Sequence, residues 1–144
     1  MGCESDAVSV AHRRRPTESA TVVRVMRPGA LGNPFGVLSK GRLVESWREA
    51  CCDAFEWSFA AALDGDSMTS LADVAEAHGL PQSSVRAPYA SMGWEEYADA
   101  VRLEAALLLS RVLGSERICL VCDCHPRRCH GATICGWLRQ RKRP

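Results

Sequence analysis

Apolar and polar positions along the chain follow two different periods, and each period predicts a type of element. Apolar side chains recur every three to four residues over residues 43–63, 94–113 and 132–143, which is the spacing of amphipathic helices. β-Branched residues alternate with other residues over 21–27, and residues 116–122 contain an unbroken apolar run. The alternation predicts a strand, and the unbroken run predicts a strand buried on both faces of a parallel sheet.

The predicted strands are separated by long helical crossovers, an order that favours a parallel sheet. We therefore expect an α/β fold, with a small parallel sheet flanked by helices in a Rossmann-like three-layer arrangement. Two strands are clear, and a third is expected within residues 84–89. The segment between the strands also contains a capping box, Ser70 with Asp73, which opens a short helix that ends at Gly79.

The chain length predicts a single domain. Its 144 residues, 47% of them hydrophobic, are enough to bury one core. Residues 1–20 have no sustained period and predict a flexible N-terminal arm, residues 21–140 form the α/β domain, and residues 141–144 are a basic tail. No apolar run has the length of a membrane helix or of a secretory signal, so we expect an intracellular, cytoplasmic protein.

Basic and acidic residues are segregated along the chain. Residues 1–42 carry seven basic against three acidic residues, and residues 117–144 carry seven against one. Residues 43–116 reverse the balance, with four basic against thirteen acidic residues. If the two basic ends meet in the fold, their arginines attract an anion.

Membranes and nucleic acids are each suggested by one motif that departs from its pattern. The start Met-Gly-Cys offers Gly2 and Cys3 for acylation, but Asp6 stands where that motif requires Ser or Thr. The segment SLADVAEAHGLPQSSVRA resembles half of a helix-turn-helix. Its second helix would be interrupted by Pro88 and would offer Arg86 alone to phosphates. A helix-turn-helix nucleic-acid binder is therefore a second alternative, and we expect a helical insertion instead.

The most informative segment is CDCHPRRCHG, residues 122–131, between the last predicted strand and the last helix. In open α/β folds ligands bind here, because strand ends open a crevice and the helix N-terminus presents unpaired N–H groups. The chain has eight cysteines without the spacing of a disulfide framework, so reduced thiols are expected. Cys119 and Cys135 are expected to be small buried hydrophobic residues.

Three chemistries fit this segment. In the first, four side chains bind a zinc ion: Cys122, Cys124, Cys129 and His130. Their spacing departs from the two separated pairs that are usual in structural zinc sites. In the second, Cys129 is a catalytic thiol whose pKa is depressed by the helix N-terminus and by His130. In the third, Arg127, Arg128 and the helix N-terminus hold a phosphate or carboxylate, without cysteine chemistry.

Two motifs, taken together and in this order, resemble those of a known family. RPGALGNPF follows the first predicted strand, and CDCHPRRCHG follows the last one. They resemble the signature motifs of the family called domain of unknown function 4326. The resemblance implies one α/β domain over residues 22–139, with residues 64–92 as an insertion that covers or reshapes the cleft. It implies no established activity, and Asp123 stands where the family usually has an aromatic residue.

The resemblance also implies that the two motif loops meet, since neighbouring parallel strands end at the same sheet edge. One pocket would then be lined by Arg27, Asn33, Arg127, Arg128, Cys129 and His130. Asn33 offers both a donor and an acceptor, which suits a base or an amide. The leading hypothesis is a pocket for an anionic, nucleotide-like small molecule, with Cys129 and His130 as candidate catalytic residues. The alternative is a structural zinc-binding module.

Overall fold

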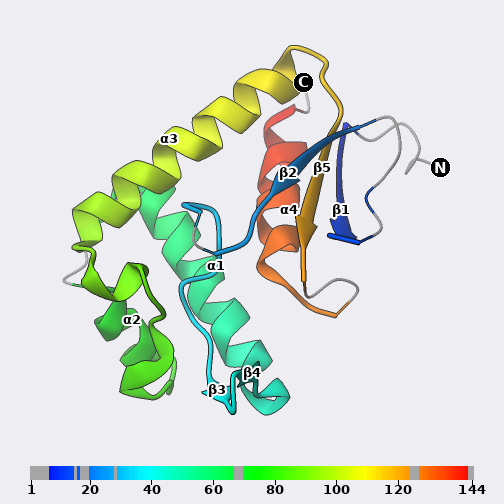
Figure 1. Ribbon diagram of the computed structural model, residues 1–144. Helices are drawn as coiled ribbons and strands as arrows, with labels where there is room; N and C mark the ends of the chain where they lie inside the picture. The colour runs from blue at the N-terminus through cyan, green and yellow to red at the C-terminus, as the bar shows by residue number, and fades with distance from the viewer. Residues whose placement is uncertain are drawn as a thin grey trace.

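The computed structural model describes residues 7–14, 16, 20–27, 29–66, 70–123 and 127–142 of the chain. Its centre is a three-stranded parallel sheet with the strand order β1-β5-β2 (Figure 1). The strands are β1 (Val8–His12), β2 (Thr21–Arg24) and β5 (Ile118–Cys122). Every residue of the central strand β5 is buried, as the unbroken apolar run predicts. The α/β class and the small parallel sheet flanked by helices are confirmed.

Four α-helices accompany the sheet: α1 (Arg48–Asp64), α2 (Leu71–Ala77), α3 (Trp94–Leu113) and α4 (His130–Lys142). A short hairpin, β3 (Leu38–Ser39) and β4 (Arg42–Leu43), precedes α1. Single 3-10 turns cover Glu45–Trp47, Gln82–Ser84 and Tyr89–Ser91. The N-cap half of the predicted capping box is confirmed, because the Ser70 hydroxyl accepts a hydrogen bond from the Asp73 N–H at 3.1 Å. Within the described residues, none of these helices combines the length and the apolar character that crossing a bilayer requires.

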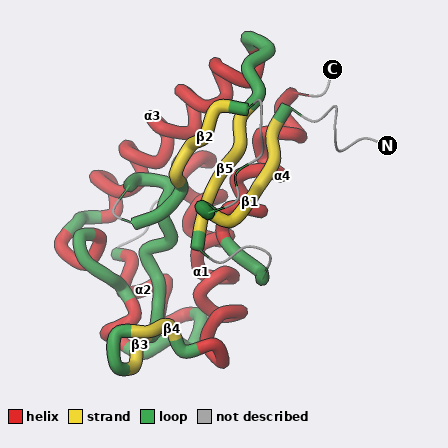
Figure 2. Tube along the Cα trace, turned by 45° about the vertical axis from the view of Figure 1, so that its right-hand side comes forward, coloured by secondary structure: helices red, strands yellow, loops and turns green. Residues whose placement is uncertain are grey.

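The helices pack on one face of the sheet. α4 packs directly against β1 and β5, and α1 and α3 pack against α4 (Figure 2). The β5 side chains that belong to this main core are Ile118, Leu120 and Cys122. The opposite face carries a small cluster without any helical residue of the described chain: Ala11, Ala20, Cys119 and Val121. A three-layer arrangement has helices on both faces of the sheet, whereas the described helices pack on one face.

The first strand lies in the segment that the sequence predicts to be a flexible arm, so that prediction is wrong for Val8–His12. β1 pairs in parallel with β5, with Val8 opposite Ile118. α4 also holds the strand, because Arg139 donates to the Val8 carbonyl from Nε at 3.1 Å and from Nη2 at 2.8 Å. The hydrogen bonds to β5 and α4 fix a segment whose own sequence is too short to show a clear period.

The segment after α2 forms neither a strand nor a recognition helix. Val85 makes an isolated bridge with Phe35, and two 3-10 turns flank it. The third strand expected at residues 84–89 and the helix-turn-helix alternative are therefore both wrong. Proline explains the interruption, because Pro88 has no N–H to continue a helix.

We expect Val8→Ala to lower the free energy of unfolding by about 2 kcal/mol, because it removes two buried methyl groups. Val8 is 1% exposed, whereas Val22 on the other outer strand is 47% exposed. Val22→Ala is the matched control and should change the free energy by less than about 0.5 kcal/mol. Urea unfolding of the full chain measures both. If Val8→Ala and Val22→Ala lower the free energy of unfolding by the same small amount, β1 does not pack into the core.

Candidate functional site

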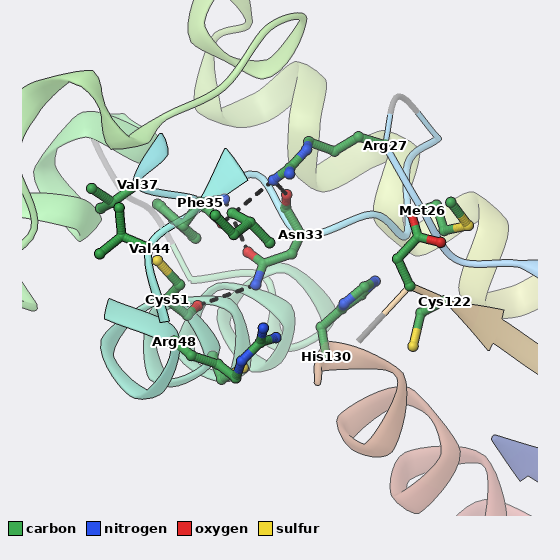
Figure 3. A pocket seen from close by; sticks show the side chains of 13 residues that line it. Met26, Arg27, Asn33, Phe35, Val37, Val44, Arg48, Cys51, Cys122 and His130 are labelled. Carbon is green, nitrogen blue, oxygen red and sulfur yellow. Dashed lines mark hydrogen bonds between the residues drawn. The ribbon is translucent and has the colours of Figure 1, made fainter. Parts of the chain in front are cut away.

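A cavity of about 200 Å³ lies where β2 and β5 end (Figure 3). Four parts of the chain line it: the segment after β2, the β3-β4 hairpin, the start of α1 and the junction of β5 with α4. Its polar lining consists of Arg27, Asn33, Arg48, Asp123 and His130, and its thiols are Cys51, Cys52 and Cys122. The two motif loops therefore meet at one site, as the resemblance implies.

The loop after β2 is held in place by its own polar side chains. Arg27 donates from Nη1 to the carbonyl of Asn33 at 2.9 Å and to that of Phe35 at 3.5 Å. Asn33 accepts from the Phe35 N–H at 2.9 Å and donates to the Cys51 carbonyl of α1 at 3.3 Å. Figure 3 shows the Asn33 amide between Arg27 on one side and Arg48 on the other. These bonds satisfy the polar groups of the loop and attach it to α1.

The backbone packs so closely at Gly32 that no side chain fits there. A Cβ atom would lie 2.6 Å from the backbone nitrogen of Arg27 and 2.6 Å from the hydroxyl oxygen of Tyr89. Tyr89 donates to the Gly29 carbonyl at 2.6 Å, so it supports the loop from outside the cavity. The described part of residues 64–92 contributes no lining residue. Residues 64–66 and 70–92 therefore support the loop and do not line the cavity.

His130 forms a wall of the cavity and is the first residue of α4. Its Nε2 is hydrogen-bonded to the Val25 carbonyl, so Nε2 carries the hydrogen and Nδ1 keeps its lone pair. The ring of Phe55 lies 5.1 Å away at an interplanar angle of 73°, an edge-to-face contact. Burial lowers the pKa of His130 to about 4, and the Arg27 guanidinium acts in the same direction. The imidazole is therefore neutral at neutral pH and held in one orientation.

Arg48 is a cavity residue that the sequence prediction missed. The periodicity of residues 43–63 assigns it to the polar face of a helix, but α1 begins at Arg48 itself. Its side chain is 10% exposed and donates to Glu45 Oε1 at 3.1 Å. Hydrogen bonding to Arg48 holds the pKa of Glu45 below its usual range, and the charge of Arg127 acts in the same direction. The sequence carries no signal for this position, because the apolar spacing runs unbroken across residues 43–63.

Arg127 and Arg128 do not line the cavity, although the sequence prediction places them there. Arg127 donates to Glu45 at 2.9 Å. Arg128 pairs with three acidic residues that follow one another along α1: Glu49, Asp53 and Glu56. Hydrogen bonding to Glu49 raises the pKa of Arg128 above its ordinary value. The basic end of the chain therefore pairs with the acidic middle and holds the loop before α4 against α1.

Cys122 and Cys129 bring their sulfur atoms within 3.1 Å of each other. Both thiols are buried, and Cys122 is the one that lines the cavity. The hydrogen bond with Cys122 raises the pKa of Cys129, and so does burial, whereas the Gly131 N–H at the start of α4 acts to lower it. The depressed pKa predicted for Cys129 is therefore wrong, because the thiol contact and burial outweigh the helix N-terminus. Cys119 and Cys135 are buried, as predicted.

Two of the four predicted zinc ligands, Cys122 and Cys129, are in contact. Cys124 lies outside the described residues, and the Nε2 of His130 is bonded to Val25. In the part of the chain that the structure describes, no three His, Cys, Asp or Glu side chains gather closely enough to hold a metal ion. The zinc site stays a prediction, as do catalytic roles for Cys129 and His130.

The low pKa of His130 predicts a specific pH dependence of stability. Its pKa of about 4 lies below the usual value of about 6.5, so as the pH falls the unfolded chain takes up the proton first. Stability is therefore lost between roughly pH 6.5 and pH 4. From pH 7 to pH 5, wild type should lose about 2 kcal/mol more than His130→Gln, which keeps a donor for the Val25 carbonyl but does not titrate.

Urea unfolding at the two pH values measures this difference. His78→Gln is the matched control, since its ring bonds a carbonyl at the end of α2 and the residue is not fully buried. A wild-type chain and a His130→Gln chain with the same pH dependence would show that His130 protonates as easily when folded as when unfolded.

The comparisons with known proteins gave a match to a family model that covers both motif loops. A family model described as "Domain of unknown function (DUF4326)" matches residues 8–140, which include both loops and the three strands of the sheet. No curated protein and no solved structure matches the chain. The match covers most of the sequence, and the chain therefore belongs to the DUF4326 family.

Proposed function

We propose that the cavity binds a small anionic molecule, of the size of the phosphate-bearing part of a nucleotide. The observation that carries the proposal is the pair of guanidinium groups, Arg27 and Arg48, on opposite sides of the Asn33 amide in one cavity. Guanidinium groups bind phosphate and carboxylate oxygens through strong, charge-assisted hydrogen bonds. Two such groups in one small cavity favour an anion over a neutral ligand.

The charges around the cavity support this preference. Arg27 uses Nη1 for the loop carbonyls, which leaves its Nη2 and Nε donors without a partner among the described residues. The lining carboxylate, Asp123, is paired with Arg13, so its charge is compensated outside the cavity. His130 adds no charge, because burial keeps it neutral. Arg48 is paired with Glu45, so the positive charge without a carboxylate partner at the polar end of the cavity, among the described residues, is that of Arg27.

The size and the apolar walls limit the rest of the ligand. A volume of about 200 Å³ lies below the roughly 300–1,000 Å³ of sites for drug-sized ligands. The apolar part of the lining includes Val37, Leu43 and Val44. A ribose phosphate fits these limits, and a dinucleotide exceeds them. Asn33 has one N–H left for a ligand, since its other polar positions serve the loop, so it supports the site more than it reads a base.

We expect ribose 5-phosphate and AMP to bind to the full chain and adenosine, which has no charge, not to bind. Arg48→Met should weaken binding of ribose 5-phosphate roughly tenfold or more, because a charge-assisted hydrogen bond contributes about 1.5–3 kcal/mol. Arg48→Lys should give an intermediate affinity, since it keeps the charge but loses the planar fork. Isothermal titration calorimetry measures the affinity of ribose 5-phosphate for wild type, Arg48→Met and Arg48→Lys.

Arg86→Met is the matched control, because Arg86 is outside the cavity and bonds a carbonyl of its own turn. Inorganic phosphate tests whether the anion alone is enough. The proposal fails if adenosine binds as well as AMP, or if Arg48→Met and Arg86→Met have the same effect.

A further inference from the structure

The two thiols at the β5-α4 junction lie at a distance that favours covalent chemistry between them. Cys122 ends β5 and Cys129 immediately precedes α4, and their sulfur atoms are 3.1 Å apart. A disulfide requires a sulfur–sulfur distance of about 2.05 Å, so a movement of about 1 Å joins them. We propose that Cys122 and Cys129 form a redox-active dithiol, which hydrogen peroxide entering the cavity oxidises to a disulfide.

The positions of the two sulfur atoms indicate which thiol reacts with peroxide first. Cys122 lines the cavity and Cys129 does not, although both residues are almost fully buried, at 1% and 4% exposed. A peroxide molecule in the cavity therefore reaches Cys122 first, and Cys129 is placed to attack it afterwards.

The chemistry balances with hydrogen peroxide as the oxidant. The Cys122 thiolate attacks one peroxide oxygen, a sulfur–oxygen bond forms, the oxygen–oxygen bond breaks, and the released hydroxide takes up a proton to become water. Cys129 then attacks the sulfur of the Cys122 sulfenic acid, the sulfur–oxygen bond breaks, and the proton of Cys129 leaves with hydroxide as a second water. Two thiols and one peroxide yield one disulfide and two waters, and the peroxide receives two electrons.

The surroundings of the pair suit a bond that opens and closes without unfolding the chain. The loop between the two cysteines is held against α1 by Arg128, through Glu49, Asp53 and Glu56. This anchor keeps the end of β5 and the start of α4 together whether or not the bond is present. Cys122 lines the cavity, whereas Cys119 is equally buried but lies on the opposite face of the sheet.

Peptide mapping of the full chain after peroxide treatment tests the proposal. Trypsin cleaves after Arg117, Arg127, Arg128 and Arg139, and so places Cys122 in peptide 118–127 and Cys129 in peptide 129–139. We expect these two peptides to remain joined after treatment and to separate on reduction with dithiothreitol. Two of the eight thiols should be lost per chain, and fragmentation should place the bond between Cys122 and Cys129. This measurement on wild type needs no variant to fold.

Substitutions on the same two peptides give the controls. Cys122→Ser should abolish the joined peptides, and Cys129→Ser should abolish them and leave Cys122 as a sulfenic acid that dimedone traps. Cys119→Ser, Cys124→Ser and Cys135→Ser should keep the joined peptides. The proposal is overturned if the joined peptides persist in Cys122→Ser or Cys129→Ser. It is also overturned if wild type keeps all its thiols reduced, as a chain that holds one zinc ion on these sulfurs would.

Discussion

The structure depends on one buried contact, the hydrogen bond between the His130 imidazole and the Val25 carbonyl. Val25 follows β2 and His130 begins α4, so this bond joins two segments that are 105 residues apart in the chain. The ring also makes an edge-to-face contact with Phe55 of α1, which brings the buried face of this helix to the same point. Because a buried carbonyl without a partner is costly, the bond fixes the position of α4 relative to the end of β2. The cavity is the space that remains beside it.

Hydrogen bonds to backbone carbonyls also orient the side chains that face the cavity. Arg27 is positioned by the carbonyls of Asn33 and Phe35, and Asn33 is anchored to α1 through the carbonyl of Cys51. Side chains that are ordered before a ligand arrives lose little entropy when it binds, which increases affinity without further contacts. The positive cavity and the dithiol at its wall are therefore two properties of one junction. Both follow from the way the loop after β2 meets the junction of β5 with α4.

Features that depend on local pattern were predictable from the sequence, and features that depend on distant partners were not. The buried strand β5, the helix α3 and the meeting of the two motif loops all follow the sequence. β1 was missed because its five residues become a strand through pairing with β5 and hydrogen bonding from Arg139. Arg128 lies outside the cavity, where it pairs with three carboxylates of α1 that are distant from it in the sequence. The pKa of Cys129 rises because the contact with Cys122 and burial outweigh the helix N-terminus.

The central claim is that segments far apart in sequence form one cavity for an anion. It is tested most directly by titrating inorganic phosphate into isotopically labelled protein and following its amide resonances by NMR. The account predicts that the side-chain amide of Asn33 and the backbone amides of Arg27, Cys51 and His130 shift together and saturate with one affinity, while the amide of Arg86 does not shift. Shifts confined to exposed arginines outside the cavity, with the Asn33 amide unmoved, would contradict the account.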